Sequence, residues 1–311
     1  MQRAITIRIA NIERESPLLA SYMSTSAEQS VSHNYKFKSL WYDLSERTYI
    51  MGVLNVTPDS FSDGGVYFDA ERAIARGQQM ANEGADFIDI GGESSRPGSE
   101  PITDDEELRR VIPVIDRLAK TVSIPISIDT YKSKVAGKAL NAGAQIVNDI
   151  SGLTFDSNMV NVVREFEACI VLMHMKGTPK TMQKEPSYGD VVEEVAGFLA
   201  QQAGIARKEG IFRVFVDPGI GFGKTVQHNL EILKKLRRFA QLGYPLLVGP
   251  SRKSFIGKLL DAPVEGRLEG TAAAVTTSIL RGANIVRVHD VREMKKVALV
   301  ADALKNDPSN V

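Results

Sequence analysis

The sequence predicts an α/β fold in which eight parallel strands close into a barrel, each strand followed by a helix. Eight short apolar runs are separated by stretches long enough for a helix, and this alternation is typical of a parallel sheet with crossover connections. Eight such units form a single-domain (β/α)8 TIM barrel. The runs are Thr48–Val56, Asp86–Gly91, Ile124–Asp129, Gln145–Asp149, Cys169–Met173, Phe212–Asp217, Leu246–Gly249 and Ile285–His289.

Five helix ends carry the same stop signal, a glycine a few residues before the next strand. Glycine adopts the left-handed conformation of a helix C-cap without steric cost. The repetition of this signal supports a repeated helix–strand unit more strongly than any single apolar stripe. The glycines are Gly84, Gly143, Gly210, Gly243 and Gly282.

The predicted helix starts rest on capping residues. Asp69 can cap a helix that runs to about Glu83, and Thr130 can cap one that runs to about Asn141. Thr103, with Glu106 three residues later, forms a capping-box pattern. Pro113 falls inside the apolar stripe of this last helix, so we expect it to kink the helix or delay its start.

The domain organisation follows from length and patterning. A barrel takes about 250 residues, which matches residues 46–306. Residues 1–45 form an N-terminal extension without sustained periodicity and are expected to be partly disordered. Within the lead-in to the barrel, residues 36–46 are expected to form a short hairpin that covers the barrel bottom.

Composition excludes several classes of partner. The 38 Lys and Arg residues balance 38 Asp and Glu residues, so a nucleic-acid partner or an anionic membrane surface is not expected. No apolar stretch approaches the roughly 20 residues of a membrane span. The only cysteine, Cys169, lies in an apolar run and is interpreted as a buried structural thiol. These features favour a cytoplasmic protein.

Polar residues follow nearly every predicted strand, where a barrel of this kind has its active site. The first of these loops begins at Asn55 and is rich in Gly, Pro and Asp. It can be an ordinary turn, or Asn55 and nearby carboxylates can hold Mg²⁺ on a diphosphate through hard oxygen ligands. The strand-end residues are Asn55, Glu93, Asp129, Asn148, His174, Asp217, Ser251 and His289.

Eight motifs, each at a predicted strand end and in order along the chain, resemble those of dihydropteroate synthases. The resemblance implies a (β/α)8 transferase that joins (7,8-dihydropterin-6-yl)methyl diphosphate to p-aminobenzoate in folate biosynthesis, giving 7,8-dihydropteroate and diphosphate. The motifs are MGVLNVTPDSFSDGG (51–65), GGESSRPG (91–98), SIDT (127–130), VNDI (147–150), LMHM (172–175), DPGIGFGK (217–224), PSRKS (250–254) and RVHD (287–290).

For the pterin, the resemblance implies contacts with Asp129, Asn148, Ile150, Met173, Asp217, Gly249 and Lys253. The residues agree physically, because a pterin has a polar edge that needs fixed hydrogen-bonding partners when buried. Asp129 and Asp217 also suit a ring that gains positive charge as diphosphate leaves. Each acid can instead be a helix cap or part of a surface ion pair, and Lys253 can instead be a solvated loop residue.

For the diphosphate, the implied ligands are Asn55, Ser95, Arg287 and His289. Arg287 and His289 alternate with valines, so their side chains share one face of the last strand. Mg²⁺ is the implied cofactor, with Asn55 as ligand and Asp63 as a second candidate. His174 beside two methionines is interpreted as a hydrogen-bonded core residue, and Arg252 as a member of a structural ion pair.

For p-aminobenzoate, the implied contacts are Phe61, Arg96, Pro97, Phe222 and Ser254. Ser95 stands where many relatives have Thr, which bears on the packing of its loop rather than on activity. The catalytic residues are then Asp129, Asp217, Lys253 and Asn55, in an SN1-like alkyl transfer without a covalent enzyme intermediate.

Two other functions were weighed. Methyltetrahydrofolate–corrinoid methyltransferases also bind a pterin in a barrel, but they have no diphosphate to hold, so Arg287 and His289 argue against them. A catalytically silent pterin binder is the other alternative. The presence of the expected functional residues at all the strand ends argues against it. The resemblance also implies a homodimer joined through helices near the C-terminal end.

Overall fold

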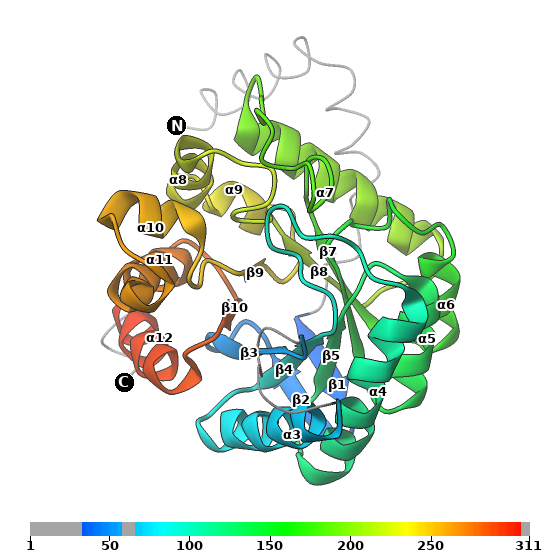
Figure 1. The fold of residues 1–311 in the computed structure, drawn as a ribbon. Coiled ribbons are helices and arrows are strands. Elements are labelled where there is room, and N and C mark those ends of the chain that lie inside the picture. Colours follow the sequence, from blue (N-terminus) through cyan, green and yellow to red (C-terminus); the bar gives the residue numbers. More distant parts are fainter. Residues whose placement is uncertain (1–32, 58–65, 306–311) are drawn as a thin grey trace, which may run out of the picture. The chain divides into compact units, whose positions relative to one another are not determined.

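The protein is described by a computed structural model that covers residues 33–57 and 66–305. Its centre is a parallel sheet in the order β8-β7-β6-β5-β4-β3-β10-β9. A parallel bridge between Val216 of β8 and Leu246 beside β9 joins the two edges, so the barrel closes (Figure 1). The predicted (β/α)8 barrel is confirmed. Its strands are β3 (Tyr49–Asn55), β4 (Phe87–Gly91), β5 (Ile126–Asp129), β6 (Ile146–Asp149), β7 (Cys169–Met173), β8 (Val214–Asp217), β9 (Leu247–Val248) and β10 (Ile285–Val288).

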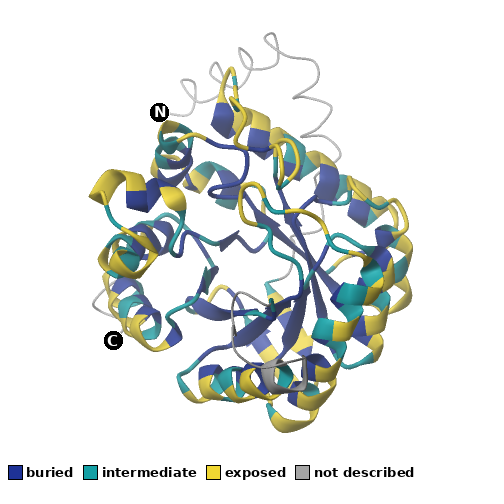
Figure 2. Ribbon diagram, viewed as in Figure 1, coloured by how far each residue is buried: buried dark blue, intermediate teal, exposed yellow. Residues whose placement is uncertain are grey.

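Helices surround the strands and bury the faces that they turn toward them (Figure 2). The strands are apolar on both faces because they pack against helices outside and against one another's side chains inside. The helices are α3 (Val66–Asn82), α4 (Asp104–Thr121), α5 (Ser133–Asn141), α6 (Met159–Glu165), α7 (Val191–Lys208), α8 (Val226–Lys234), α9 (Arg237–Ala240), α10 (Ser254–Leu260), the 3-10 helix η2 (Val264–Arg267), α11 (Leu268–Leu280) and α12 (Val291–Lys305).

The expected helix stops are confirmed, since all five glycines have positive φ, between 82° and 112°. The Thr103 cap of α4 is also confirmed, because its side chain accepts the N–H of Glu106. The Glu106 carboxylate, however, pairs with Arg109 and Arg110 instead of returning to the cap.

Two expected helix starts were wrong, and one of the two effects expected of Pro113 is excluded. The helix α3 begins at Val66, so Asp69 lies inside it and does not precede it. The helix α5 begins at Ser133 after Lys132, and the Thr130 hydroxyl accepts the N–H of Lys132 two residues before the helix. Pro113 lies inside α4, which already begins at Asp104, so it does not delay the start.

An antiparallel hairpin of β1 (Asn34–Phe37) and β2 (Leu40–Asp43) covers the bottom of the barrel, as predicted. The ring of Phe37 packs edge-on against Phe87 of β4 at 5.7 Å between centroids. The hairpin belongs to the same compact unit as the barrel, so this part of the predicted extension is folded. Cys169 is fully buried in the same core, and burial raises the pKa of its thiol to about 12, as expected for a structural cysteine.

Within residues 33–57 and 66–305, none of the helices is long and apolar enough to cross a bilayer.

Candidate active site

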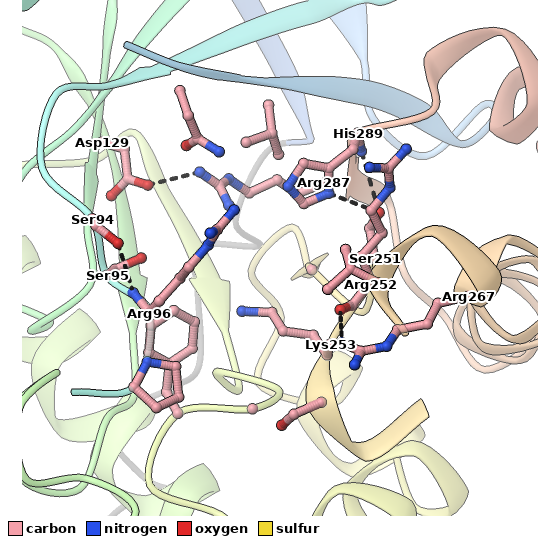
Figure 3. A pocket seen from close by; sticks show the side chains of 18 of the residues that line it. Ser94, Ser95, Arg96, Asp129, Ser251, Arg252, Lys253, Arg267, Arg287 and His289 are labelled. Atoms are coloured by element: carbon pink, nitrogen blue, oxygen red, sulfur yellow. Dashed lines mark hydrogen bonds and ion pairs between the residues drawn. The ribbon is translucent and has the colours of Figure 1, made fainter. Parts of the chain in front are cut away.

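A cavity of about 420 Å³ opens at the carboxyl ends of the strands (Figure 3). Its charged lining residues come from several strand ends and from the connections that follow them. Among them, Asp129, Lys253 and Arg287 point into the cavity (Figure 3). Its lining includes all four predicted diphosphate ligands and four of the five predicted p-aminobenzoate contacts. These residues are Asn55, Ser95, Arg287 and His289, and Arg96, Pro97, Phe222 and Ser254.

A smaller pocket adjoins this cavity deeper in the barrel and shares Asp129, Lys253 and Arg287 with it. Every residue predicted to contact the pterin lines this inner pocket. The full lining is Asp129, Asn148, Ile150, Met173, Asp217, Ile220, Phe222, Gly249, Lys253 and Arg287. The structure therefore brings the predicted pterin set together, although a contact with pterin itself stays a prediction.

A carboxylate that the sequence analysis missed lies behind this pocket, bonded to two of the residues that line it. Asp89 of β4 is fully buried, and its Oδ2 accepts from Arg287 Nε at 2.6 Å and from Asn148 Nδ2 at 2.9 Å. Arg287 Nη2 donates in turn to Asp129 Oδ2 at 2.7 Å. Asp89 could have been found, because alternation along β4 turns it into the barrel between isoleucines that face outward.

Burial brings the ionisable groups of the inner pocket toward neutral pH. It raises the pKa of Asp129 to about 7, with Asp89 adding to the rise and Arg287 opposing it. Burial likewise raises the pKa of Asp217 to about 6, while the Gly219 N–H at 2.7 Å favours the charged form. Burial lowers the pKa of Lys253 to about 8. Such groups have given up water without full compensation, which is typical of a site that awaits a polar ligand.

The imidazole of His289 is neutral and hydrogen-bonded to Ser251. Burial, with Arg287 nearby, lowers its pKa to about 3. Ser251 Oγ accepts the backbone N–H of His289 at 3.2 Å and lies 3.0 Å from His289 Nδ1. The hydroxyl can donate to Nδ1, and in that tautomer the ring hydrogen is on Nε2, from which it can be donated to an anion.

Two interpretations made from the sequence are confirmed beside the pocket. Arg252 forms an ion pair with Asp290, and its carbonyl accepts from Arg267. His174 is buried and hydrogen-bonded, but its partner was not foreseen: the ammonium of Lys224 lies 3.0 Å from Nδ1.

Lys224 is buried beneath the loop that carries Phe222. Its Nζ also donates to the carbonyls of Phe222 at 2.9 Å and His174 at 3.3 Å. The loop that carries Phe222 also lies against the segment that contains His174. A Cβ at Gly219, whose φ is +68°, would meet the His174 carbonyl at 2.0 Å. No local pattern predicts this burial, because a lysine that ends a glycine-rich loop is ordinarily solvated.

The donor set for a metal is small. Asn55, whose side chain carries an amide oxygen, lines the cavity, whereas Asp63 and Phe61 lie outside the described residues. In the part of the chain that the structure describes, no three His, Cys, Asp or Glu side chains gather as a metal cage. Mg²⁺ commonly keeps several water ligands and binds substrate phosphates with only one or two protein oxygens. The single protein oxygen at Asn55 therefore fits a metal that is bound together with the diphosphate.

The fold and the lining of this site define an enzyme of the pterin-binding class, and the family model described as "Pterin binding enzyme" matches residues 51–289. A dihydropteroate synthase of Synechocystis is 50% identical over 266 residues, which span 85% of this chain and 92% of that protein. The chain belongs to the dihydropteroate synthase family.

Solved structures agree with this assignment. The Xanthomonas albilineans dihydropteroate synthase with 4-aminobenzoic acid superposes with a TM-score of 0.83 at 42% identity, covering 89% of this chain and all of that one. The same enzyme with 7,8-dihydropteroate gives a TM-score of 0.77 at 40% identity, covering 86% of this chain and 97% of that one.

Proposed function

We propose that this chain condenses (7,8-dihydropterin-6-yl)methyl diphosphate with p-aminobenzoate to give 7,8-dihydropteroate and diphosphate in folate biosynthesis. The observation that carries the proposal is that the inner pocket, with Asp129, Asn148 and Asp217, opens into the cavity that holds Arg287 and His289. A flat polar ring and a leaving anion would thus lie side by side. Relatives whose structures contain 4-aminobenzoic acid or 7,8-dihydropteroate support the same pair of substrates.

In the inner pocket, the carboxylates do two tasks. Asp129 and Asp217, with the amide of Asn148, pair with the donors and acceptors on the pterin edge, and Met173 packs on its face. As the bond between the methylene carbon and the diphosphate oxygen breaks, the two carboxylates stabilise the positive charge that develops on the pterin. Lys253 donates to the carbonyl side of the ring.

In the outer cavity, the leaving group is received by donors. The Arg287 guanidinium offers two parallel N–H groups to phosphate oxygens, and neutral His289 donates from Nε2. Ser95 and Asn55 complete this set, and Mg²⁺ bound with the diphosphate would offset its negative charge. No step requires a covalent bond to the protein.

The second substrate reacts from the cavity side. Arg96, Pro97, Phe222 and Ser254 would hold p-aminobenzoate so that its amine faces the methylene carbon. The amine nitrogen forms the new bond and then loses a proton, so positioning supplies a large part of the acceleration. We also propose that the chain works in the cytoplasm as a homodimer. Support for the dimer comes from exposed apolar side chains on α12, among them Leu299, Val300 and Leu304.

The deciding experiment is diphosphate release by the purified protein, given the pterin diphosphate and Mg²⁺, with and without p-aminobenzoate. Release that depends on both substrates, with dihydropteroate formed, supports the proposal. Pterin binding without turnover would instead fit a silent binder, and methyl transfer from methyltetrahydrofolate to a corrinoid would fit the methyltransferase alternative.

A further inference from the structure

The loop from Glu93 to Ile102, between β4 and α4, is closed at its base by a cluster of buried charges. Glu93 Oε2 accepts from Lys132 Nζ at 2.6 Å and from the N–H of Ile102 at 3.1 Å. Lys132 Nζ donates also to the Ile102 carbonyl at 2.7 Å. One carboxylate and one ammonium thus join the first residue of the loop to the last.

The cluster extends into the neighbouring connections. Glu107 of α4 accepts from Lys132 Nζ at 2.8 Å, and the Tyr131 hydroxyl donates to Glu93 Oε1 at 2.7 Å. None of these side chains lines either part of the active-site cavity. The side chains of Lys132, Glu93 and Glu107 are only 12%, 9% and 1% exposed.

A buried charge cluster of this kind is an expensive way to stabilise a fold. Desolvation of the three ions offsets much of their attraction, and apolar residues of similar volume often serve stability as well. Burial raises the pKa of Glu107 even though Lys132 opposes the shift, whereas Glu107 and Glu93 raise the pKa of Lys132 against its own desolvation, so the attraction favours the lysine more than the buried glutamate. A role in fixing the geometry of the loop explains why Glu93 and Lys132 are charged at a buried position, which stability alone does not explain.

That role is set by what the loop carries. Arg96 and Pro97, near its tip, line the outer cavity. The tip itself is held at two points: the Gly98 N–H donates to the Pro179 carbonyl at 2.9 Å, and Ser99 Oγ donates to the Arg96 carbonyl at 2.8 Å. The loop is thus held to Pro179 at its tip and by Glu93 and Lys132 at its base, and the position of Arg96 depends on both attachments.

We propose that Glu93 and Lys132 are positioning residues that fix the base of this loop and so place Arg96 and Pro97 against p-aminobenzoate. The proposal rests on the proposed function for its substrate. It assigns no contact with substrate to either residue. Its consequence is selective, because the inner pocket that would hold the pterin is lined neither by Glu93 and Lys132 nor by the loop that they close.

The test is Glu93→Gln, which keeps the side-chain shape but removes the charge, with Asp105→Asn as the matched control. Asp105 forms an exposed ion pair with Lys134. It lies two residues before Glu107 on α4, and Lys134 lies two residues after Lys132 on α5. For Glu93→Gln we expect the KM for p-aminobenzoate to rise about tenfold, the effect of weakening one charge-assisted hydrogen bond. The KM for the pterin diphosphate, and pterin binding by calorimetry, should stay within about twofold.

Lys132→Arg provides a second variant, because it keeps the charge at the base and should retain more p-aminobenzoate affinity than Lys132→Met. Equal losses of affinity for both substrates, or an unchanged KM for p-aminobenzoate in Glu93→Gln, would overturn the positioning role. If the unaltered protein makes no dihydropteroate, the proposed function fails instead, and the two failures are therefore distinguishable.

Discussion

Arg287 and Asp129 form an ion pair across the barrel mouth, with Arg287 Nη2 2.7 Å from Asp129 Oδ2. These two residues were predicted for different ligands, Asp129 for the pterin and Arg287 for the diphosphate. The same arginine is held from behind by fully buried Asp89 at 2.6 Å. A pterin that pairs with Asp129 would compete with Arg287 for that carboxylate, and Asp89 would keep the arginine in place while it turns to the leaving group.

The pH profile of turnover should depend on Asp129. Because burial raises its pKa to about 7, the carboxylate takes up a proton as the pH falls below that value, and kcat/KM should fall with it. Asp129→Asn should lower kcat/KM at pH 8 by about 10²-fold or more, as expected when a group that stabilises developing charge is lost. Initial rates between pH 5.5 and 9 check both effects. An Asn variant with full turnover would remove Asp129 from the mechanism.

The same substitution should affect stability in the opposite sense. A carboxyl whose pKa is raised in the folded state favours folding when protonated, so its contribution is present below about pH 4 and is lost as the pH rises through 7. Relative to the parent protein, Asp129→Asn should therefore be more stable at pH 8 than at pH 5. By scanning calorimetry, the Tm of Asp129→Asn minus the Tm of the parent protein should be about 2 °C or more higher at pH 8 than at pH 5. A Tm difference that does not change with pH would contradict the raised pKa.

Asp89 should matter for both stability and pterin binding. It accepts from Arg287 and from Asn148, so Asp89→Asn leaves a buried guanidinium with one carboxylate where it had two. Removing one partner of a buried ion pair costs about 3–5 kcal/mol, which sets the expected loss in the free energy of unfolding. Urea unfolding and pterin calorimetry measure the two effects. As a control, Asp116→Asn removes an exposed helix ion pair with Lys120 and should change neither by more than about 0.5 kcal/mol.

The sequence predicted the barrel because its signals are local and repeated: short apolar runs, glycine stops and polar strand ends each depend on a few neighbouring residues. The strand-end position also placed Asp129, Asn148 and Asp217 in one pocket, since parallel strands share one edge. Asp89 and Lys224 were missed because their roles depend on distant partners, Arg287 and His174, that no local pattern reveals. Asp69 and Thr130 were misplaced as caps for a related reason: several polar residues near a helix start can cap it, and tertiary packing selects among them.

Two lysines near the inner pocket, Lys224 and Lys253, provide a matched pair of substitutions with opposite expected results. Lys224 donates to His174 Nδ1 and to two backbone carbonyls beneath the site, while the Lys253 ammonium lies in the pocket, 4.0 Å from the ring centroid of Phe222. Lys224→Met should destabilise the fold by about 1–3 kcal/mol, because buried acceptors lose their donor. Lys253→Met should abolish most turnover and pterin affinity with little loss of stability, because its ammonium faces the pocket, whereas that of Lys224 bonds two backbone carbonyls.

Urea unfolding at pH 7.5 and pterin binding, measured on both variants, separate the two roles. If Lys253→Met destabilised the fold as much as Lys224→Met while pterin still bound, Lys253 would be a structural residue. The pterin carbonyl would then need another donor among the residues of the inner pocket, and Arg287 is the cation there that could supply one. Such a result would move the arginine from the leaving group to the ring and would leave His289 and Ser95 as the remaining diphosphate donors.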